Sequence, residues 1–450
     1  MCFIVYMPIE VCSISGFSKT EGNSVAIKID DEVVIIDMGL AMENYIKHQE
    51  DREDISAAKT YNELLKAQAL PDYGHIKDWY DMVVAIVPSH GHLDHVGAIP
   101  FAASLFPNAP VICSPYTAEI LKSILWDERI KIPNKIVSMG LNATYKISDK
   151  ITIEFINVTH SIPHTVMVAV HTPYGKVLYA NDYKFDRQPV IGKKPNFARM
   201  KELGDEGVDL LIVNCLYAHA HIKTPSESVA RQMLKDVMIG IDSENKAMIV
   251  TTFSSHLARL KSIIEMGKKL DRKIVFLGRS LMKYVKAAQR INLVDFEKDV
   301  MLFRRRDKIE KILRKIEKEG RDKYLIVCTG HQGEPRAILS RISRGEIDFK
   351  FQEGDFVVFS CQIIPVEINL KNRERLEKSL RANGVRIFRD VHVSGHGALE
   401  DHRDLFELVR PKNIMPIHAE NEKAIMLADF AKSLGFKKTH VMKDGQRINF

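Results

Sequence analysis

The chain has 450 residues, and its 65 Lys and Arg outnumber its 58 Asp and Glu, which gives a net charge of +7. That length is sufficient for two or three domains, and 45% apolar with 27% charged residues is ordinary for a folded, water-soluble protein. No apolar run reaches the roughly 18 residues that a membrane-spanning helix needs, and residues 1–6 lack the basic start and the cleavage site of a signal peptide. The six cysteines are scattered and form no Cys-x-x-Cys pair, which predicts reduced, mostly buried thiols in a cytoplasmic protein.

The first part of the chain alternates strand signals with helical ones. Residues 26–29 and 32–37 are predicted to form a hairpin that turns at Asp30 and Asp31. A charged, helical insertion is predicted over 43–80, followed by strands at 83–87, 111–113, 151–158, 166–171 and 176–179. This alternation favours a sheet covered by helices on both sides.

From about Val208 the pattern becomes a regular alternation of strands and long helices. Strands are predicted at 210–214, 247–252, 273–277, 324–329 and 355–360, with helices at 226–238, 257–269, 281–290 and 307–319. Such a pattern is typical of an open parallel sheet, in which loops at the carboxyl ends of the strands gather around ligands. We therefore expect a parallel-sheet domain over 209–384, inserted into a metal-binding domain made of 1–208 and 385–450.

The most informative motif is Ser89-His90-Gly91-His92-Leu93-Asp94-His95, which directly follows the apolar strand at 83–87. Neutral imidazoles and a carboxylate are ligands for zinc and similar divalent ions, and two ligand sets this close suit two ions. A polar turn rich in histidine is the alternative, but adding the Asp-His pair to the His-x-His pair makes a turn a poor explanation. The segment predicts a dinuclear metal site at the edge of a sheet.

The remaining ligands of such a site are expected where other strands end. The candidates at strand ends are Asp37, His160, Asp182 and His418. Each one alone is more typical of a cap or a polar turn, but the same placement recurs along the chain.

These residues, in this order, match the motifs of the metallo-β-lactamase superfamily, and the inserted domain resembles the β-CASP domain of its nucleic-acid-cleaving members. The chain is similar over nearly its whole length to ribonuclease J, in the archaeal length form. The segments that carry this resemblance are Thr159-His160-Ser161-Ile162-Pro163, Asn181-Asp182-Tyr183-Lys184-Phe185-Asp186, Thr252-Phe253-Ser254-Ser255, Leu277-Gly278-Arg279-Ser280, Thr329-Gly330-His331-Gln332-Gly333-Glu334-Pro335, Ser394-Gly395-His396-Gly397 and Pro416-Ile417-His418-Ala419-Glu420. The resemblance implies an α/β fold, an αββα sandwich with an inserted β-CASP domain.

The resemblance also implies a role for each candidate ligand, with two divalent metal ions as cofactors, zinc first and manganese as the alternative. One ion would be held by His90, His92 and His160, the other by Asp94, His95 and His418, with Asp182 bridging both. Asp37 would orient a ligand or the bridging water. Two cations about 3.5–4 Å apart activate a shared water and clamp a phosphodiester.

The activity that the resemblance implies is that of a zinc-dependent ribonuclease, which degrades single-stranded RNA from 5′-monophosphate ends in RNA decay and maturation. The catalytic residues would be Asp37, Asp182 and His396, of which His396 would deliver a proton to the leaving 3′-oxygen from a glycine-flanked loop. The terminal phosphate would be bound by Ser254, Ser255, Ser394, Gly395 and His396. A structural loop histidine is the alternative for His396, and N-caps are the alternative for the two adjacent serines.

Two positions depart from the family pattern. Position 214 is Asn, where the β-CASP pattern usually has an acid, and an amide can orient a neighbour but cannot act as a base. Position 164 is His, where ribonuclease J often has Asp. Both departures leave the seven predicted ligands in place and bear on rate, ion preference and direction.

Several alternatives stay open at this point. An endonuclease of the same fold would share this active site, a small-molecule metallo-hydrolase would not need the inserted domain, and a non-catalytic RNA-binding relative would usually have lost ligands. The basic run from Arg304 to Lys318 fits a phosphate-contacting surface and a solvated helix face about equally well. A homodimer also stays open, through surfaces other than the C-terminal dimerisation domain of bacterial relatives, which we expect to be absent.

Overall fold

The computed structural model describes residues 9–51 and 60–450, so the N-terminal segment 1–6 and Cys2 lie outside the described residues. The chain forms two compact units: unit 1 comprises Met1–Phe185, Lys193–Thr224 and Gly395–Phe450, and unit 2 comprises Asp186–Gly192 and Pro225–Ser394. The five cysteines in the described part of the chain are buried and free, as predicted. Among the described residues, none of the helices combines the length and the apolar character that a membrane crossing requires.

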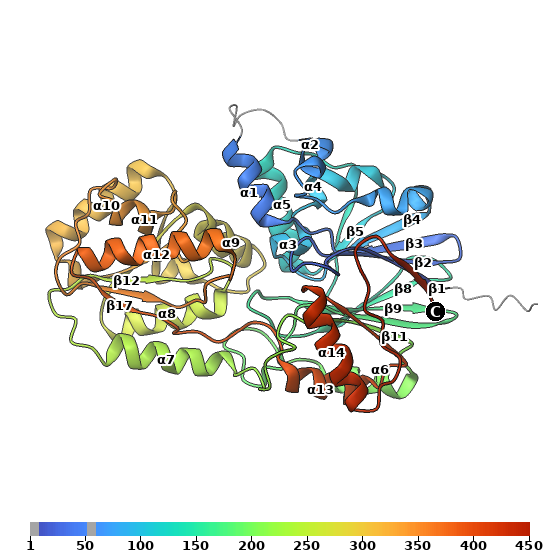
Figure 1. The fold of residues 1–450 in the computed structure, drawn as a ribbon. Helices are drawn as coiled ribbons and strands as arrows, with labels where there is room; N and C mark the ends of the chain where they lie inside the picture. The colour runs from blue at the N-terminus through green and yellow to red at the C-terminus, as the bar shows by residue number, and fades with distance from the viewer. Residues whose placement is uncertain (1–8, 52–59) are drawn as a thin grey trace, which may run out of the picture. The chain divides into compact units, whose positions relative to one another are not determined.

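Two sheets that pack face to face form the centre of unit 1 (Figure 1). The first has the strand order β19-β1-β2-β3-β4-β5-β6, and the second has the order β18-β11-β10-β9-β8-β7. The strands of the first sheet are β1 (Ile9–Ser15), β2 (Ser24–Ile29), β3 (Glu32–Ile36), β4 (Val83–Val87), β5 (Val111–Cys113), β6 (Ile136–Ser138) and β19 (Arg447–Asn449). Those of the second are β7 (Thr144–Lys146), β8 (Thr152–Asn157), β9 (Val166–Thr172), β10 (Gly175–Ala180), β11 (Leu210–Asn214) and β18 (Asn413–Ile417).

Helices cover the outer faces of both sheets, which confirms the αββα sandwich (Figure 1). The helices on the side of the first sheet are α1 (Met42–Asp51), α2 (Tyr61–Lys66), α3 (Leu93–Val96), α4 (Ile99–Ala102) and α5 (Pro115–Glu128), with the 3-10 helices η1 (Tyr73–Met82) and η2 (Ala103–Leu105). The second sheet is covered by α6 (Phe197–Glu206), α13 (Leu399–Val409) and α14 (Asn421–Ser433). Because central strands are buried on both faces, β4 and β11 read as continuous apolar runs.

Unit 2 is built on a six-stranded sheet of order β14-β13-β15-β12-β16-β17, in which every neighbouring pair is parallel. Its strands are β12 (Met248–Thr251), β13 (Lys273–Leu277), β14 (Val300–Phe303), β15 (Tyr324–Cys328), β16 (Phe356–Phe359) and β17 (Arg386–Phe388). Its helices are α7 (Glu227–Ile239), α8 (Leu257–Lys269), α9 (Arg279–Arg290), α10 (Arg306–Glu319), α11 (Ile338–Ser343) and α12 (Glu367–Ala382), with η3 (Phe296–Lys298) and η4 (Arg321–Lys323). Helices α10, α11 and α12 share one apolar core with the sheet, and α7 and α8 lie on its other face (Figure 1). The predicted parallel sheet is confirmed.

The strand predicted at 210–214 belongs to a sheet of unit 1 and not to the parallel sheet of unit 2. We expected 210–214 to begin the parallel sheet of the insertion, but β11 lies between β10 and β18 in unit 1, parallel to both. A strand buried on both faces has the same apolar sequence in either sheet, so only its distant hydrogen-bond partners show where it belongs. Strand β17 differs in the opposite direction. We assigned 385–450 to the metal-binding domain, but β17 pairs with β16 of unit 2.

Candidate metal centre

The candidate ligands come from the carboxyl ends of strands in both sheets of unit 1. β4 ends three residues before His90, β10 ends two residues before Asp182, and β18 ends directly before His418. Asp37 and His418 have left-handed backbones, with φ of 59° and 71°, a conformation that non-glycine residues adopt rarely. Seven predicted ligands thereby meet at one edge of the sandwich.

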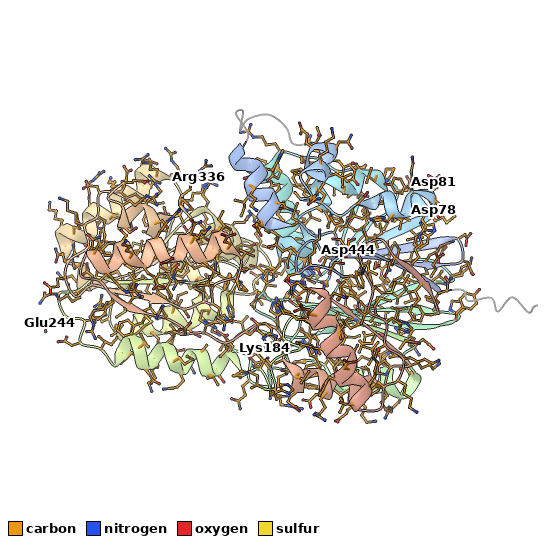
Figure 2. The ribbon with its side chains drawn as sticks, in the orientation of Figure 1. Asp78, Asp81, Lys184, Glu244, Arg336 and Asp444 are labelled. Atoms are coloured by element: carbon orange, nitrogen blue, oxygen red, sulfur yellow. The ribbon has the colours of Figure 1, made fainter. Side chains whose placement is uncertain are left out.

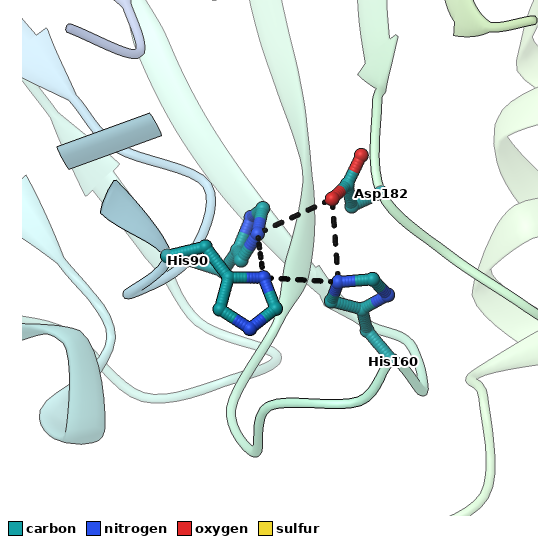
Figure 3. A group of neighbouring side chains, drawn as sticks. His90, His160 and Asp182 are labelled. Atoms are coloured by element: carbon teal, nitrogen blue, oxygen red, sulfur yellow. Dashed lines mark hydrogen bonds and ion pairs between the residues drawn. The ribbon is translucent and has the colours of Figure 1, made fainter. Parts of the chain in front are cut away.

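The first group of ligand atoms consists of three imidazoles and one carboxylate, from His90, His92, His160 and Asp182. Figure 3 shows His90, His160 and Asp182 pointing toward one another. The His92 Nδ1 atom lies 3.1 Å from His90 Nε2 and 3.2 Å from His160 Nε2. Asp182 Oδ2 lies 3.4 Å from His90 Nε2 and 3.2 Å from His160 Nε2.

The second group consists of Asp94, His95 and His418. His95 Nε2 lies 3.4 Å from Asp94 Oδ2 and 3.5 Å from Asp182 Oδ2. His418 Nε2 lies 3.6 Å from the other oxygen of the same carboxylate, Asp182 Oδ1. Asp182 therefore touches both groups, as a bridging ligand must.

A buried carboxylate behind the second group fixes the orientation of His95. Asp37 is fully buried, and its Oδ2 accepts hydrogen bonds from His95 Nδ1 (2.7 Å), Tyr179 Oη (2.7 Å) and Ser89 Oγ (3.0 Å). Its Oδ1 accepts from the backbone N–H of Ser89 at 2.6 Å. Because the proton of neutral His95 lies on Nδ1, the Nε2 lone pair faces the ligand cluster. The sequence had indicated no role for Ser89, the first residue of the histidine-rich motif, or for Tyr179, which lies in the strand before Asp182.

A backbone carbonyl fixes the orientation of His160. The carbonyl of Gly395 lies 2.7 Å from His160 Nδ1, and because a carbonyl only accepts, Nδ1 carries the proton and Nε2 presents its lone pair. A Cβ atom at position 395 would come within 2.8 Å of Ser161 and 3.0 Å of the His160 ring. The absence of a side chain at Gly395 thus permits the close approach of the His160 loop, and its predicted contact with a phosphate stays a prediction.

The atoms of these groups fit divalent metal ions. Ligand atoms about 2.0–2.1 Å from a tetrahedral zinc ion lie roughly 3.3 Å apart, and the four contacts of the first group range from 3.1 to 3.4 Å. The Nε2 atom of His95 is buried without a hydrogen-bond partner and faces two carboxylates. Burial lowers the pKa of the His95 imidazole, but three neighbouring carboxylates outweigh burial and raise it well above its usual value. The cluster thus demands positive charge, which a cation supplies.

His396 forms a third group of closely spaced ligand atoms with Asp182 and His418, and Asn214 orients it. The Asn214 side chain accepts from the backbone N–H of Leu216 at 2.8 Å and donates to Asp182 Oδ1 at 2.9 Å, which fixes the orientation of the amide. The same amide nitrogen lies 3.3 Å from His396 Nδ1. Since the amide nitrogen only donates, Nδ1 is the acceptor and the proton of neutral His396 lies on Nε2. Burial lowers the pKa of His396 to about 3, so the imidazole is neutral at pH 7.

Comparisons with known proteins agree with this geometry. Three family models match the chain: "Ribonuclease J, beta-CASP domain" over residues 245–374, "Metallo-beta-lactamase superfamily" over 81–205, and "Zn-dependent metallo-hydrolase RNA specificity domain" over 385–442. The chain is 39% identical to the ribonuclease J of Methanocaldococcus jannaschii over 449 residues, which cover 99% of each chain. It is 38% identical to the ribonuclease J of Pyrococcus abyssi, covering 98% of this chain and 97% of that one. The chain belongs to the ribonuclease J family.

The same fold occurs in a solved structure of distant sequence. A protein of unknown function from Enterococcus faecalis superposes with a TM-score of 0.66 and covers 98% of this chain and 100% of its own, at 17% sequence identity. That likeness supports the fold alone. The ribonuclease J family is shown by the archaeal relatives.

The phosphate-binding residues predicted from the ribonuclease J resemblance fall into both units. Gly395 and His396 belong to unit 1, whereas Ser254, Ser255 and Ser394 belong to unit 2. Ser254 Oγ lies 2.9 Å from Ser280 Oγ. The helix α8 begins after His256, so neither Ser254 nor Ser255 is its N-cap.

The second departure from the ribonuclease J pattern, His164, has a structural setting. Its backbone is left-handed, with φ of 60°, and its carbonyl accepts a hydrogen bond from Ser114 Oγ at 2.7 Å. Burial lowers the pKa of His164 to about 4. Among the described residues it belongs to none of the groups that could hold a metal ion.

Proposed function

We propose that this protein is a metal-dependent ribonuclease that hydrolyses single-stranded RNA processively from the 5′ end and prefers a 5′-monophosphate. The observation that carries the proposal is the convergence of seven His and Asp side chains on one edge of unit 1, with Asp182 common to both groups. Membership of the ribonuclease J family supports RNA as the substrate. We further propose zinc as the metal, with manganese as the alternative.

Two divalent cations held by these residues would lower the pKa of a nearby water and neutralise charge on the phosphodiester. The residues around them supply orientation. Asp37 and the Gly395 carbonyl keep the protons of His95 and His160 on the far side of each ring, so that the lone pairs face the site. Asn214 donates a hydrogen bond to Asp182, the carboxylate that would bind both ions.

The leaving 3′-oxygen of a cleaved phosphodiester needs a hydrogen-bond or proton donor, and His396 offers one. With Nδ1 accepting from Asn214, the Nε2–H group of the neutral ring is available as the donor. Its imidazole packs parallel to that of His418, with the ring centroids 5.6 Å apart, which keeps it beside the ligand cluster. This arrangement favours a catalytic role for His396 over that of a structural loop histidine.

The distribution of charge supports a polyanionic substrate. Unit 2 contains 36 Lys and Arg against 24 Asp and Glu, a net charge of +12, which leaves −5 for the rest of the chain. In and before α10, acids pair with Arg305, Arg306, Arg314 and Lys315. Lys308, Lys311 and Lys318 stand on the exposed face of the helix, and Arg336 projects from the surface of the same unit (Figure 2). Such a surface attracts phosphates independently of sequence.

The proposal is tested with one RNA sequence carrying a 5′-monophosphate, a 5′-triphosphate or a 5′-hydroxyl, with and without chelator. We expect mononucleotides to be released fastest from the monophosphate RNA, and chelation to stop the reaction. Internal fragments that form regardless of the 5′ group would instead identify an endonuclease. Hydrolysis of thioesters or lactams without RNA cleavage would identify a small-molecule metallo-hydrolase, and activity that survives full chelation would contradict the metal mechanism.

A further inference from the structure

A buried carboxylate in unit 1 ties together three segments that are far apart in the sequence. Asp401, in the first turn of α13, is fully buried. Its Oδ2 accepts from the backbone N–H groups of Thr224 (2.8 Å) and Ala398 (3.1 Å), and its Oδ1 accepts from that of Phe185 (3.3 Å). Phe185 and Thr224 are the last residues of two segments of unit 1, and Ala398 lies three residues after the chain re-enters it.

The same three segments hold the loop that carries His396. The hydroxyl of Thr224 donates to the carbonyl of His396 at 2.8 Å. The N–H of Gly397 donates to the carbonyl of Tyr183 at 2.5 Å. A Cβ atom at Gly397 would lie 3.0 Å from the Cβ of Asp401, so the loop packs directly on this residue. The hydrogen bonds therefore run from Asp401 through Thr224 to the backbone of His396.

We propose that Asp401 and Thr224 are positioning residues for the ribonuclease reaction, which set the place of the His396 imidazole without touching substrate or metal. Asp401 fixes the backbone of Thr224, and the Thr224 hydroxyl then fixes the carbonyl of His396. This proposal rests on the function proposed above. Displacement of a catalytic group by about 1 Å can cost 100-fold in rate, so a single distant hydroxyl can control turnover.

The discriminating variant is Thr224→Val, which keeps the branched shape and replaces the hydroxyl by a methyl group. Thr172→Val is the control, because its hydroxyl also donates to a backbone carbonyl, that of Gly175 at 2.8 Å, and accepts from the N–H of Tyr174 at 3.1 Å in the β9–β10 hairpin. We expect Thr224→Val to lower kcat about 10-fold or more, with KM within about 3-fold and bound metal unchanged, whereas the control should keep the wild-type kcat. Thr224→Ser, which restores the hydroxyl, should recover kcat to within about 3-fold.

A readout independent of activity separates this proposal from the proposed function. In protein labelled with ¹⁵N at histidine, the His396 imidazole signals, assigned by loss in His396→Gln, should shift or broaden in Thr224→Val and not in Thr172→Val. Unchanged His396 signals, or a kcat for Thr224→Val equal to that of the control, would overturn the positioning role. A loss of kcat that Thr224→Ser fails to recover would also overturn the positioning role.

Wild-type protein without chelator-sensitive RNA cleavage would overturn the proposed ribonuclease function instead. Asp401→Asn should reproduce the Thr224→Val effect; if it does not fold, the threonine variants still decide.

Discussion

Replacing Asp37 by asparagine tests whether the buried carboxylate behind the ligand cluster sets the metal affinity. The carboxylate has two acceptor oxygens, of which one takes three donors and the other takes the backbone N–H of Ser89 at 2.6 Å. An amide has one oxygen, so whichever way it turns, its N–H₂ group faces at least one buried donor. If the amide oxygen stays with His95 and Tyr179, the bond to Ser89 is lost; if it turns, the orientation of His95 is lost.

The expected magnitude follows from these contacts. One buried donor without an acceptor costs about 1–3 kcal/mol, so the free energy of unfolding of the metal-free protein should fall by about that amount. Loss of an orienting partner behind a metal-bound histidine typically weakens metal binding about 10–100-fold, which corresponds to about 1.4–2.7 kcal/mol. Tyr179→Phe removes only one donor and keeps the carboxylate, so it should weaken metal binding less than about 3-fold.

Metal affinity is measured by titrating metal-free protein with zinc against a chromophoric chelator, and stability by urea unfolding with the site empty. Wild-type protein, Asp37→Asn and Tyr179→Phe are compared under the same conditions. If Asp37→Asn bound both ions with wild-type affinity, the orienting role of Asp37 would be refuted. Equal losses in Asp37→Asn and Tyr179→Phe would show that the effect comes from packing and not from the carboxylate.

Three further predictions concern ligands, pH and salt. His92→Ala should lose at least one of the two bound ions, by elemental analysis, together with RNA cleavage, and a fully active variant would contradict the ligand assignment. Burial lowers the pKa of His402 from 6.5 to about 3, so between these values the unfolded chain binds a proton that the folded chain does not, and stability falls as pH drops below 6.5. By pH 5 the wild-type protein should have lost about 2 kcal/mol more than His402→Asn, as measured by urea unfolding at each pH. Replacing Lys308, Lys311 and Lys318 by Gln should reduce the slope of log K for RNA binding against log salt by up to about 2, whereas an unchanged slope would assign these lysines to a solvated helix face.

The sequence grouped side chains that lie together in the structure, because the signals it uses are local. Each of the seven candidates follows an apolar run, and parallel strands bring their carboxyl ends to one edge of a sheet. His90 and His418 are separated by more than 300 residues, yet their residue types and their places after strands were sufficient to group them. Ser89 and Tyr179 escaped the same reasoning, because a serine and a tyrosine beside a motif have many uses.

The role of Asn214 shows where sequence reasoning ends. The residue type alone excluded a base, but it could not show that the amide donates to both Asp182 and His396. The place of β11 is a similar case, since its apolar sequence is compatible with either sheet and only the pairing with β10 and β18 decides.

The amino-acid sequence by itself determined the candidate metal ligands, the two sheet types and the family resemblance, because these depend on residue type and on short-range periodicity. Tertiary structure alone decided which ring nitrogen carries the proton in His95 and His160, and which groups hold these rings in place. The partners that set these features lie far away along the chain: Tyr179 is 142 residues from Asp37, and Gly395 is 235 residues from His160. Hydrogen bonds of that range arise only when the fold closes, so no local pattern encodes them.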